Sequence, residues 1–536
     1  MFLKKALCIR TISYLVYFIL LVILVFLCSR FCDLISVQAL DCDTFAYMHV
    51  HAKMAHGLRA HQIREFFGYG FYSYGLYYFT LNTLLVYSFI ACKKIAWVIF
   101  LPRLVSVLPA LGTGWISYKL SKKYLGDLES LAMSVLIFLM PCYTQTACWT
   151  HPDSLMLFWL SLGIWFLFQD HLNLQREYWI AVICFGISVA TKIQSVTFLP
   201  MLFFYVVFAK KWSFKPKDIG GLIMKMGASF LAIGGVFVLL NPYLLHPRGL
   251  NAFMFSYHAN MDSNVTNNSL GTVSVLDKIQ HVLLGSYYSP LLLALVVLAS
   301  FVAVYKINQP RHRIYGCLSL TIWINTVYLL FFVNKEWPHY YLGVMVLGVW
   351  LLTHLFSLFP KEMRVKLVVM VIIFQIVWAC HIVYHSMHQK ITIGIPPLPT
   401  FFLTQETRDK LYSAKKTSEF ILANLDEVTP TTTVLLNKDG FDFIKLGLDR
   451  LHVVTPYSSG LMATIDYEAY KKANPQKSDD EAKAGFVRFN YLVVDKRTLD
   501  LEKNSEKNII GKLGYRLIAQ NDSTLIFKLQ TRKACF

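Results

Sequence analysis

Long apolar segments recur along the first 386 residues, and they constrain the fold more than any other feature of the chain. They lie near residues 12–28, 95–117, 129–148, 154–169, 177–191, 195–209, 219–242, 282–305, 313–333, 340–359 and 365–386. A helix of about 20 apolar residues is long enough to cross the hydrocarbon core of a bilayer. Because 56% of the whole chain is hydrophobic as well, the sequence predicts a polytopic α-helical membrane protein with about 11 transmembrane helices.

The positive charge of the chain follows these segments. A formal net charge of +19 would also suit a nucleic-acid-binding protein. However, the basic residues cluster in short loops between apolar segments, as the positive-inside rule predicts for membrane proteins, so we expect no nucleic-acid partner. Lys4, Lys5 and Arg10 precede the first segment and predict a cytoplasmic N-terminus. That segment lacks the small-residue cleavage site of a signal peptide and is predicted to be an anchor.

One apolar stretch does not fit the alternation of the loops. If Leu76 to Ala91 crossed the membrane, later basic loops such as Lys122-Lys123 would face outward, against the charge rule. We therefore interpret residues 72–92 as a juxtamembrane or re-entrant helix, one of several juxtamembrane helices expected on the outer face within residues 38–92. The aromatic run from Phe66 to Phe79 suits such an interfacial position.

The C-terminal region has a different composition. Residues 391–536 hold 21 basic and 18 acidic residues, which is typical of a soluble domain. The sequence predicts a helix around 415–425 and strands at 432–436, 451–454, 491–494, 515–519 and 523–529, the last two joined by a turn at Asn521-Asp522. We therefore expect a transmembrane domain over residues 1–389 and a small extracytoplasmic α/β domain over residues 390–536.

Acidic residues are scarce in the transmembrane region and are therefore informative. Up to Lys390 there are only 14 Asp and Glu against 30 Lys and Arg. Two of the acids, Asp41 and Asp43, follow the first apolar segment at its outer end. A carboxylate placed there can take a proton from a hydroxyl group or hold a divalent cation. A solvated loop is the alternative reading for such a pair.

Other polar residues fall on the same predicted outer face. They come from four further turns: His151 and Asp153; Lys192 and Gln194; Asn241, Tyr243, His246 and Arg248; and Lys335, Glu336 and His339. A single His or Lys at such a position is usually an interfacial anchor. Ionisable groups at membrane depth, however, mark substrate or ion paths more often than they mark packing. Taken together, these residues predict one polar cavity that opens outward.

These motifs resemble those of a known group of enzymes. The acidic pair after the first helix, the outward His151-Pro152-Asp153-Ser154, Thr191-Lys192 at a hairpin tip and Lys335 through Tyr341 form the shared pattern. It resembles the GT-C type of polyprenyl-phosphate-sugar-dependent glycosyltransferase, in the branch of the protein O-mannosyltransferases and aminoarabinose transferases. The resemblance covers about residues 1–386. Relatives usually have Asp-Glu in the first loop, whereas Asp43 is followed by Thr44, so either Asp41 or Asp43 can be the acid of that family.

The resemblance implies a reaction and a set of site residues. Such enzymes transfer a sugar, a hexose or a pentose, from a polyprenyl-phosphate-linked donor to a glycan, lipid or protein acceptor, with inversion at the anomeric carbon. Asp43 or Asp41 would be the catalytic base. Lys192, Arg103 and His339 would stabilise the donor phosphate, and His151, Asp153 and Glu336 would bind the acceptor. No cofactor is required, although Asp41 and Asp43 could hold a divalent cation.

Two other classes of function stay open at this point. The first is a polymerase or ligase of lipid-linked glycans, and the second is a transporter or flippase of lipid-linked sugars. Paired helices broken by Gly or Pro would favour a transporter, and the sequence has no such internal repeat. We expect the bacterial inner membrane rather than the endoplasmic reticulum, because the C-terminal region carries no retention signal.

Overall fold

The computed structural model describes residues 2–30, 32, 42–72, 74–92, 94–209, 216–266 and 272–388, and parts of the C-terminal region between residues 416 and 530. The chain divides into two units. The first comprises Met1–Cys32 and Cys42–Leu403, and the second comprises Asp33–Asp41 and Thr404–Phe536. The predicted boundary at residues 389 and 390 lies outside the described residues.

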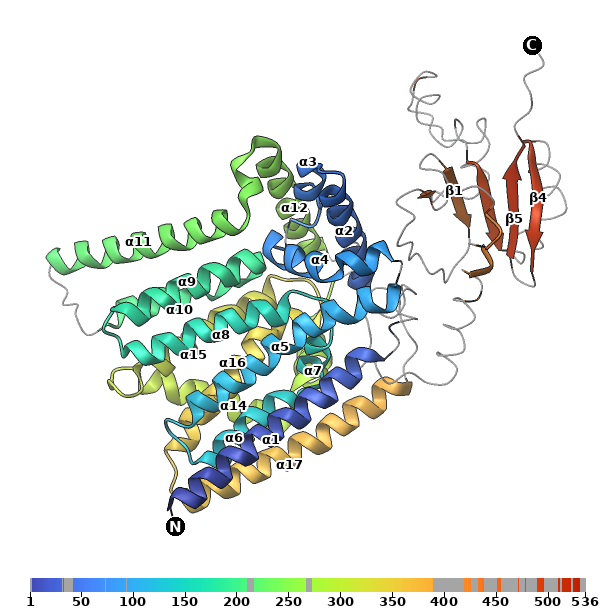
Figure 1. Ribbon diagram of the computed structural model, residues 1–536. Coiled ribbons are helices and arrows are strands. Elements are labelled where there is room, and N and C mark those ends of the chain that lie inside the picture. The colour runs from blue at the N-terminus through green and yellow to red at the C-terminus, as the bar shows by residue number, and fades with distance from the viewer. Residues whose placement is uncertain are drawn as a thin grey trace. The chain divides into compact units, whose positions relative to one another are not determined.

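The first unit is helical, as predicted. Its helices are α1 (Phe2–Ser29), α2 (Cys42–Arg59), α3 (Ile63–Phe67), α4 (Leu76–Ala91), α5 (Ile95–Ser121), α6 (Asp127–Phe138), α7 (Pro141–Ala147), α8 (Asp153–Asp170), α9 (Arg176–Thr191), η1 (Ile193–Phe198), α10 (Pro200–Val207), α11 (Pro216–Leu240), η2 (Pro242–Leu245), α12 (Pro247–Thr266), α13 (Val275–Asp277), η4 (Lys278–Tyr287), α14 (Pro290–Tyr305), α15 (Arg313–Phe331), η5 (Pro338–Tyr341), α16 (Leu342–Ser357) and α17 (Lys361–His388). Figure 1 shows α2, α3, α4 and α12 grouped near one end of helices such as α5, α8 and α9.

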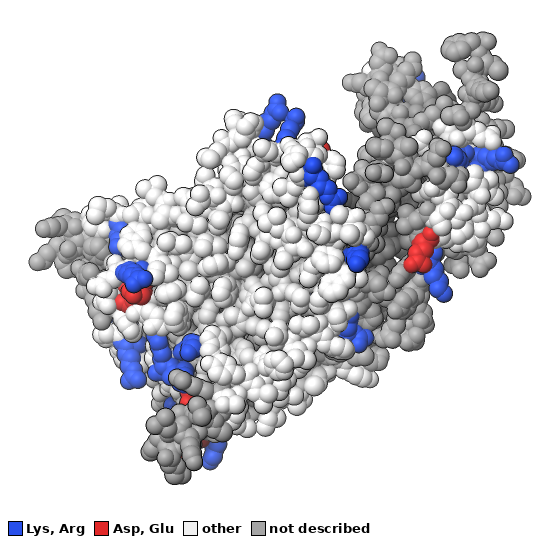
Figure 2. Space-filling model, viewed as in Figure 1, with Lys and Arg blue, Asp and Glu red and all other residues white. Residues whose placement is uncertain are grey.

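Six of the described helices are long and apolar enough to cross a membrane: α1, α5, α11, α15, α17 and the stretch from η5 through α16. Two bent pairs raise the number to eight if each pair is one span. Figure 2 shows Lys and Arg gathered towards the ends of the helices, with little charge between them. The protein is therefore an integral, multi-pass membrane protein, and the count of about 11 spans stays a prediction.

The two bent pairs differ from the straight spans that the sequence predicts at 129–148 and 282–305. Helices α6 and α7 meet at an angle of 76°, and the η4 segment meets α14 at 105°. Pro141 and Pro290 stand at the first position of α7 and α14. Proline lacks the N–H that a continuing helix needs, and it also disfavours helical geometry at the residue before it. The helix therefore restarts at each proline in a new direction.

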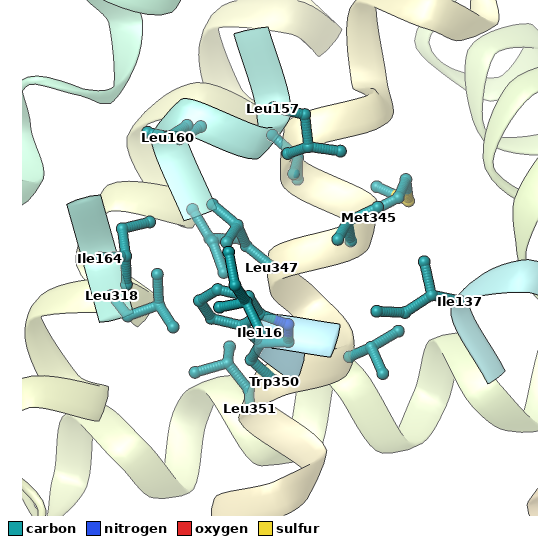
Figure 3. Packing of buried hydrophobic residues seen from close by; sticks show 14 of the residues in the cluster. Ile116, Ile137, Leu157, Leu160, Ile164, Leu318, Met345, Leu347, Trp350 and Leu351 are labelled. Atoms are coloured by element: carbon teal, nitrogen blue, oxygen red, sulfur yellow. The ribbon is translucent and has the colours of Figure 1, made fainter. Parts of the chain in front are cut away.

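Helix α16 lies in the centre of the first unit. Its residues from Leu342 through Phe356 are all buried, as expected for a helix that is apolar on every side. Figure 3 shows Trp350, Leu347 and Met345 of this helix among side chains from four other helices. These are Ile116 of α5, Ile137 of α6, Leu157, Leu160 and Ile164 of α8, and Leu318 of α15. This core packs α5, α6, α8 and α15 around α16.

The predicted helix at 72–92 is observed as α4. Its 16 residues reach about 24 Å at 1.5 Å per residue, which is shorter than the hydrocarbon core of a bilayer. Tyr78 and Phe79 of α4 pack with Tyr47 of α2 and Tyr243 of η2 in one aromatic cluster. The aromatic run that the sequence places at an interface therefore holds the short helices together.

The second unit contains a five-stranded sheet. Its strands are β1 (Thr432–Asn437), β2 (Leu451–Val454), β3 (Tyr491–Asp495), β4 (Tyr515–Gln520) and β5 (Thr524–Leu529). They lie in the order β2-β1-β3-β5-β4, with β1 parallel to both neighbours and β5 antiparallel to both of its own. At the predicted turn, Oδ1 of Asn521 accepts from the Thr524 N–H at 2.8 Å. All five strands agree with the sequence prediction.

Candidate functional site

The site begins where α9 ends and α4 starts. The Gly75 N–H donates to the Thr191 carbonyl at 2.9 Å, and Tyr74 pairs with Lys192 as an isolated β-bridge. A side chain at residue 75 has no room, since its Cβ would lie 1.6 Å from the Ala190 carbonyl oxygen. Glycine at this position allows the two backbones to touch.

Asn241, which lies in a third segment between α11 and η2, forms hydrogen bonds to the same junction. Its Oδ1 accepts from the Leu76 N–H at 2.9 Å, and its amide group donates to Ala190 O at 3.4 Å and to Phe237 O at 3.0 Å. The starts of α4 and η2 and the end of α9 are thus tied together. This arrangement determines where the side chain of Lys192 emerges.

Three charged or polar side chains meet at this junction. The Lys192 ammonium donates to Oδ1 of Asp153 at 2.5 Å, and Nδ1 of His151 lies 2.8 Å from Oδ2 of the same carboxylate. Asp153 and His151 have no exposed surface, and Lys192 is 4% exposed. Burial strengthens the attraction between opposite charges and also makes each of them costly to leave alone. The ammonium keeps the carboxylate ionised, and the carboxylate orients the imidazole.

His339 and several aromatic rings complete the cluster. The rings of His151 and His339 are 5.2 Å apart between centroids, and Trp149 stacks on His151 at 5.5 Å. Tyr47 of α2 and Tyr74 approach His151 at 5.7 and 5.3 Å. Side chains from α2, from η5 and from the segments that precede α4 and α8 therefore converge on one imidazole.

A cavity of about 230 Å³ opens beside Lys192. It is lined by Tyr74, Lys192, Ile193, Gln194, Val196, Thr197, Tyr257, Asn260, Met261, Asn264, Tyr328, Leu329, Val333 and Tyr340. The Lys192 ammonium lies 5.5 Å from the ring centroids of both Tyr74 and Tyr340. Aromatic faces, amides and one cation beside an apolar wall suit a ligand that joins a sugar, a phosphate and a lipid chain.

The structure brings together four of the predicted site residues, His151, Asp153, Lys192 and His339. Arg103 and Glu336 have other contacts. Nη1 of Arg103 donates to Cys28 O at 2.8 Å and to Arg30 O at 3.0 Å, at the end of α1. A carboxylate oxygen of Glu336 lies 3.2 Å from Nδ1 of His281.

The two acids that the sequence predicts for catalysis are described only in part. Asp41 lies outside the described residues, and Asp43 is the second residue of α2, with its side chain outside the description. Tyr47 follows Asp43 by one helical turn and approaches the ring of His151. Whether Asp41 or Asp43 is the base stays a prediction.

Sequence reasoning did not assign the cavity residues Tyr74, Asn264 and Tyr340 to the site. Asn264 belongs to a glycosylation triplet, Asn264-Val265-Thr266. In the structure, however, its side chain lines the cavity and accepts from the Tyr340 hydroxyl at 3.4 Å. No local signal separates a cavity asparagine from a surface asparagine, because the difference arises where α12 approaches η5.

The cluster also has the donor types of a metal site. One ligand atom from each of His151, Asp153 and His339 lies within 4.8 Å of the others. Among the described residues this is the one such group of three. Lys192 already places a positive charge on one oxygen of that carboxylate, and a bound metal ion would have to share the carboxylate with it. The predicted cation site at Asp41 and Asp43 is a different one.

Comparison with known proteins gives a family match over part of the chain and a similar fold over most of it. No curated protein matches the chain. The family described as dolichyl-phosphate-mannose-protein mannosyltransferase matches residues 90–233, a range that holds Arg103, His151, Asp153 and Lys192.

The fold resembles that of ArnT from Cupriavidus metallidurans in the apo state, with a TM-score of 0.55 and 11% identity, over 97% of this chain and 98% of that one. The structure of ArnT from the same organism bound to undecaprenyl phosphate has a TM-score of 0.53 and 10% identity, over 96% and 97% of the two chains. The chain therefore shares its fold with these two ArnT structures, and residues 90–233 match the mannosyltransferase family.

Proposed function

We propose that this protein transfers a sugar from a polyprenyl-phosphate-linked donor to a hydroxyl group of a glycan, lipid or protein acceptor, at the outer face of the membrane. The observation that carries the proposal is the buried group of Lys192, Asp153 and His151 beside a cavity with aromatic, amide and apolar walls. A nucleotide-activated sugar is cytosolic, so a site at the outer face needs a donor carried by lipid.

The transfer is a single displacement at the anomeric carbon. The acceptor oxygen forms a bond to that carbon while the bond from the carbon to the phosphate oxygen breaks. The electron pair of the broken bond stays on the phosphate, and the acceptor proton passes to a carboxylate base. One displacement from the opposite face inverts the configuration, whether the sugar is a hexose or a pentose.

We assign the base to Asp43, with Asp41 in support. Asp43 stands at the start of α2, one turn before Tyr47, whose ring lies 5.7 Å from the ring of His151. An acid in the first turn of a helix also stabilises the helix dipole, so the carboxylate is compatible with the fold as well as with the reaction. No cofactor is required, and a divalent cation at Asp41 and Asp43 is the alternative that a chelator tests.

Asp153 and its neighbours act as a positioning unit for the acceptor. The short ion pair with Lys192 holds the carboxylate, and the carboxylate holds His151. His339, 9% exposed and beside His151, can donate a proton to the leaving phosphate. We place Glu336 at the edge of the site, where its contact with the exposed His281 leaves it open to the acceptor.

The orientation and the compartment are part of the proposal. We place the N-terminus in the cytoplasm and the second unit outside, in a bacterial inner membrane. The basic loop at Lys119, Lys122 and Lys123 supports this orientation, because it lies at the end of α5 that is remote from the site.

A transfer assay tests the proposal. Purified protein in liposomes would be given a panel of polyprenyl-phosphate-linked sugars and a mixture of membrane glycans, lipids and peptides. We expect one donor to be consumed, with release of polyprenyl phosphate and a product of inverted configuration by NMR. If every donor is left intact, or the sugar keeps its configuration, the proposed reaction is wrong.

A further inference from the structure

Two buried lysines contact the connection between α15 and η5, and their ammonium groups have different hydrogen-bond acceptors. Lys278, at the start of η4, is 2% exposed. Its ammonium donates to the carbonyls of Leu329 at 3.4 Å, Leu330 at 2.7 Å and Val333 at 2.6 Å. Leu329 and Leu330 lie in the last turn of α15, where the helix leaves carbonyls without intrahelical partners, and Val333 follows that helix. All three N–H groups of Lys278 are therefore used by the fold.

Lys335 lies on the same connection and is 1% exposed. Its ammonium donates to Oγ of Ser263 at 2.6 Å, which is its one hydrogen-bond acceptor among the described residues. It also lies 4.0 Å from the ring centroid of Trp337 and 5.9 Å from that of Tyr340. An ammonium has three N–H donors, so one oxygen atom and two ring faces leave part of its hydrogen-bonding capacity unused.

No acidic side chain in the described part of the chain forms an ion pair with Lys335. The adjacent Glu336 contacts His281 instead. Burying an ammonium without a negative partner is costly, and burial lowers the pKa of Lys335 to about 8. A protein keeps such a cation where an anion will bind, and ionisable groups of this kind mark substrate sites in membrane proteins.

Lys192 provides the contrast. It lines the cavity, but its ammonium lies 2.5 Å from Oδ1 of Asp153. The positive charge of Lys192 is thus already balanced by a carboxylate. Lys335 has no such carboxylate partner among the described residues, so its ammonium attracts an incoming anion more strongly than that of Lys192 does.

Lys335 lies next to residues that line the same cavity. Ser263, which accepts its hydrogen bond, lies between the cavity residues Met261 and Asn264 in α12. The ring of Tyr340 is near both cations, with its centroid 5.5 Å from the Lys192 ammonium and 5.9 Å from that of Lys335. A phosphate at this wall would lie against Leu329, Val333 and Tyr340, with the Lys335 ammonium beside the Tyr340 ring.

We propose that Lys335 holds the phosphate of the lipid-linked donor and that Lys192 holds Asp153 in place. This inference rests on the proposed function. When the sugar leaves, the electron pair of the broken carbon–oxygen bond stays on the phosphate, whose negative charge rises. The Lys335 ammonium, kept dry by Trp337 and Tyr340, stabilises that charge and keeps its own protons.

Direct binding of undecaprenyl phosphate to the purified full-length protein in detergent tests the inference. We expect Lys335→Met to weaken binding at least tenfold, since a hydrogen bond to a charged group is worth more than a neutral one. Lys335→Arg keeps the charge and should bind within about threefold of wild type. The matched control is Lys278→Met, which removes a lysine of similar burial from the same connection. It should lower the unfolding temperature and leave the dissociation constant unchanged.

The outcomes separate this inference from the proposed function. If the wild-type protein does not bind undecaprenyl phosphate, the proposed function is wrong and the inference fails with it. If the wild type binds and Lys335→Met binds equally well, the function stands and the assignment of Lys335 is wrong. Inorganic phosphate at the same concentration as the lipid should not compete. Equal competition would assign Lys335 to free phosphate and overturn the donor role.

Discussion

The ammonium of Lys192 lies 2.5 Å from Oδ1 of Asp153, and neither side chain is more than 4% exposed. The two residues are separated by 39 positions in the chain, at the end of α9 and the start of α8. Removing one partner of a buried ion pair leaves an uncompensated charge, which costs more than the pair itself contributes. The stability of this region therefore depends on both residues being present or both being absent.

Single variants of this pair should be less stable than the double variant. Lys192→Met leaves the Asp153 carboxylate buried beside two histidines, and Asp153→Asn leaves the Lys192 ammonium without its partner. We expect each to destabilise the protein by about 3–5 kcal/mol, and the combined variant to recover part of the loss. A double-mutant cycle on thermal unfolding in detergent measures this coupling. Additive losses would mean that the pair contributes nothing as a pair.

Asp43→Asn should remove the catalytic base while keeping the size of the side chain. We expect turnover to fall by roughly 100-fold or more, the range expected for loss of general-base catalysis, with donor binding retained. Asp262→Asn, a change at an exposed acid of α12, is the matched control and should leave turnover unchanged. If the Asp41→Asn, Asp43→Asn and double variants all work at near-normal rates, the base lies elsewhere. Recovery of an Asn variant on addition of a divalent ion would instead indicate a metal site.

Gly75→Ala should separate the start of α4 from the end of α9. The new Cβ would lie 1.6 Å from the Ala190 carbonyl oxygen, so one of the two backbones has to move. We expect a lower unfolding temperature and loss of activity, because Lys192 lies in the segment after α9 that the new methyl group would displace. Gly227→Ala in α11 is the control, since nothing lies within 4 Å of its Cβ. Alanine is the better helix former, so Gly227→Ala should leave the protein at least as stable as wild type.

Donor use should weaken as the pH rises through about 8. Burial lowers the pKa of Lys335 to about 8, so the ammonium is present below this pH and is lost above it. The diester phosphate of a sugar donor keeps one negative charge over the same range and does not offset the loss. We expect KM for the donor to rise above pH 8 in the wild type and to stay flat in Lys335→Arg, whose guanidinium remains charged. The same rise in both proteins would assign the titration to another group.

Membrane topology gives a prediction that does not depend on the chemistry. Reporter fusions after Lys390 and within Ser121–Gly126 should report opposite sides of the membrane, with the second on the cytoplasmic side. The physical basis is the excess of Lys and Arg at the end of α5. Both reporters on one side would mean that α4 is a full crossing or that another apolar segment is not.

Local pattern was enough to predict the membrane class and the elements of both units. Apolar segments of the right length form helices wherever they occur, so α1, α5, α11 and α17 follow from composition over a short window. The alternation of residues in β3 and β5 and the turn at Asn521 are equally local. Even the breaks at Pro141 and Pro290 have a local cause, although the bend angles do not.

Only the tertiary structure decided which polar residues share a site. The sequence placed His151, Asp153, Lys192 and His339 on one face, and the packing of α8, α9 and η5 brought them into contact. It also directed Arg103 to the end of α1. No short-range pattern encodes these pairings, because they join residues far apart in the chain.

Lys192 and Lys335 show the same difference between what local sequence predicts and what tertiary packing decides. From sequence, Lys192 and Lys335 are both lysines in outer turns beside apolar segments. In the structure one has a carboxylate at 2.5 Å, and the other has a serine hydroxyl and two aromatic rings. The sequence determines where a lysine stands. Whether its ammonium can bind an anion depends on whether the fold places a carboxylate beside it.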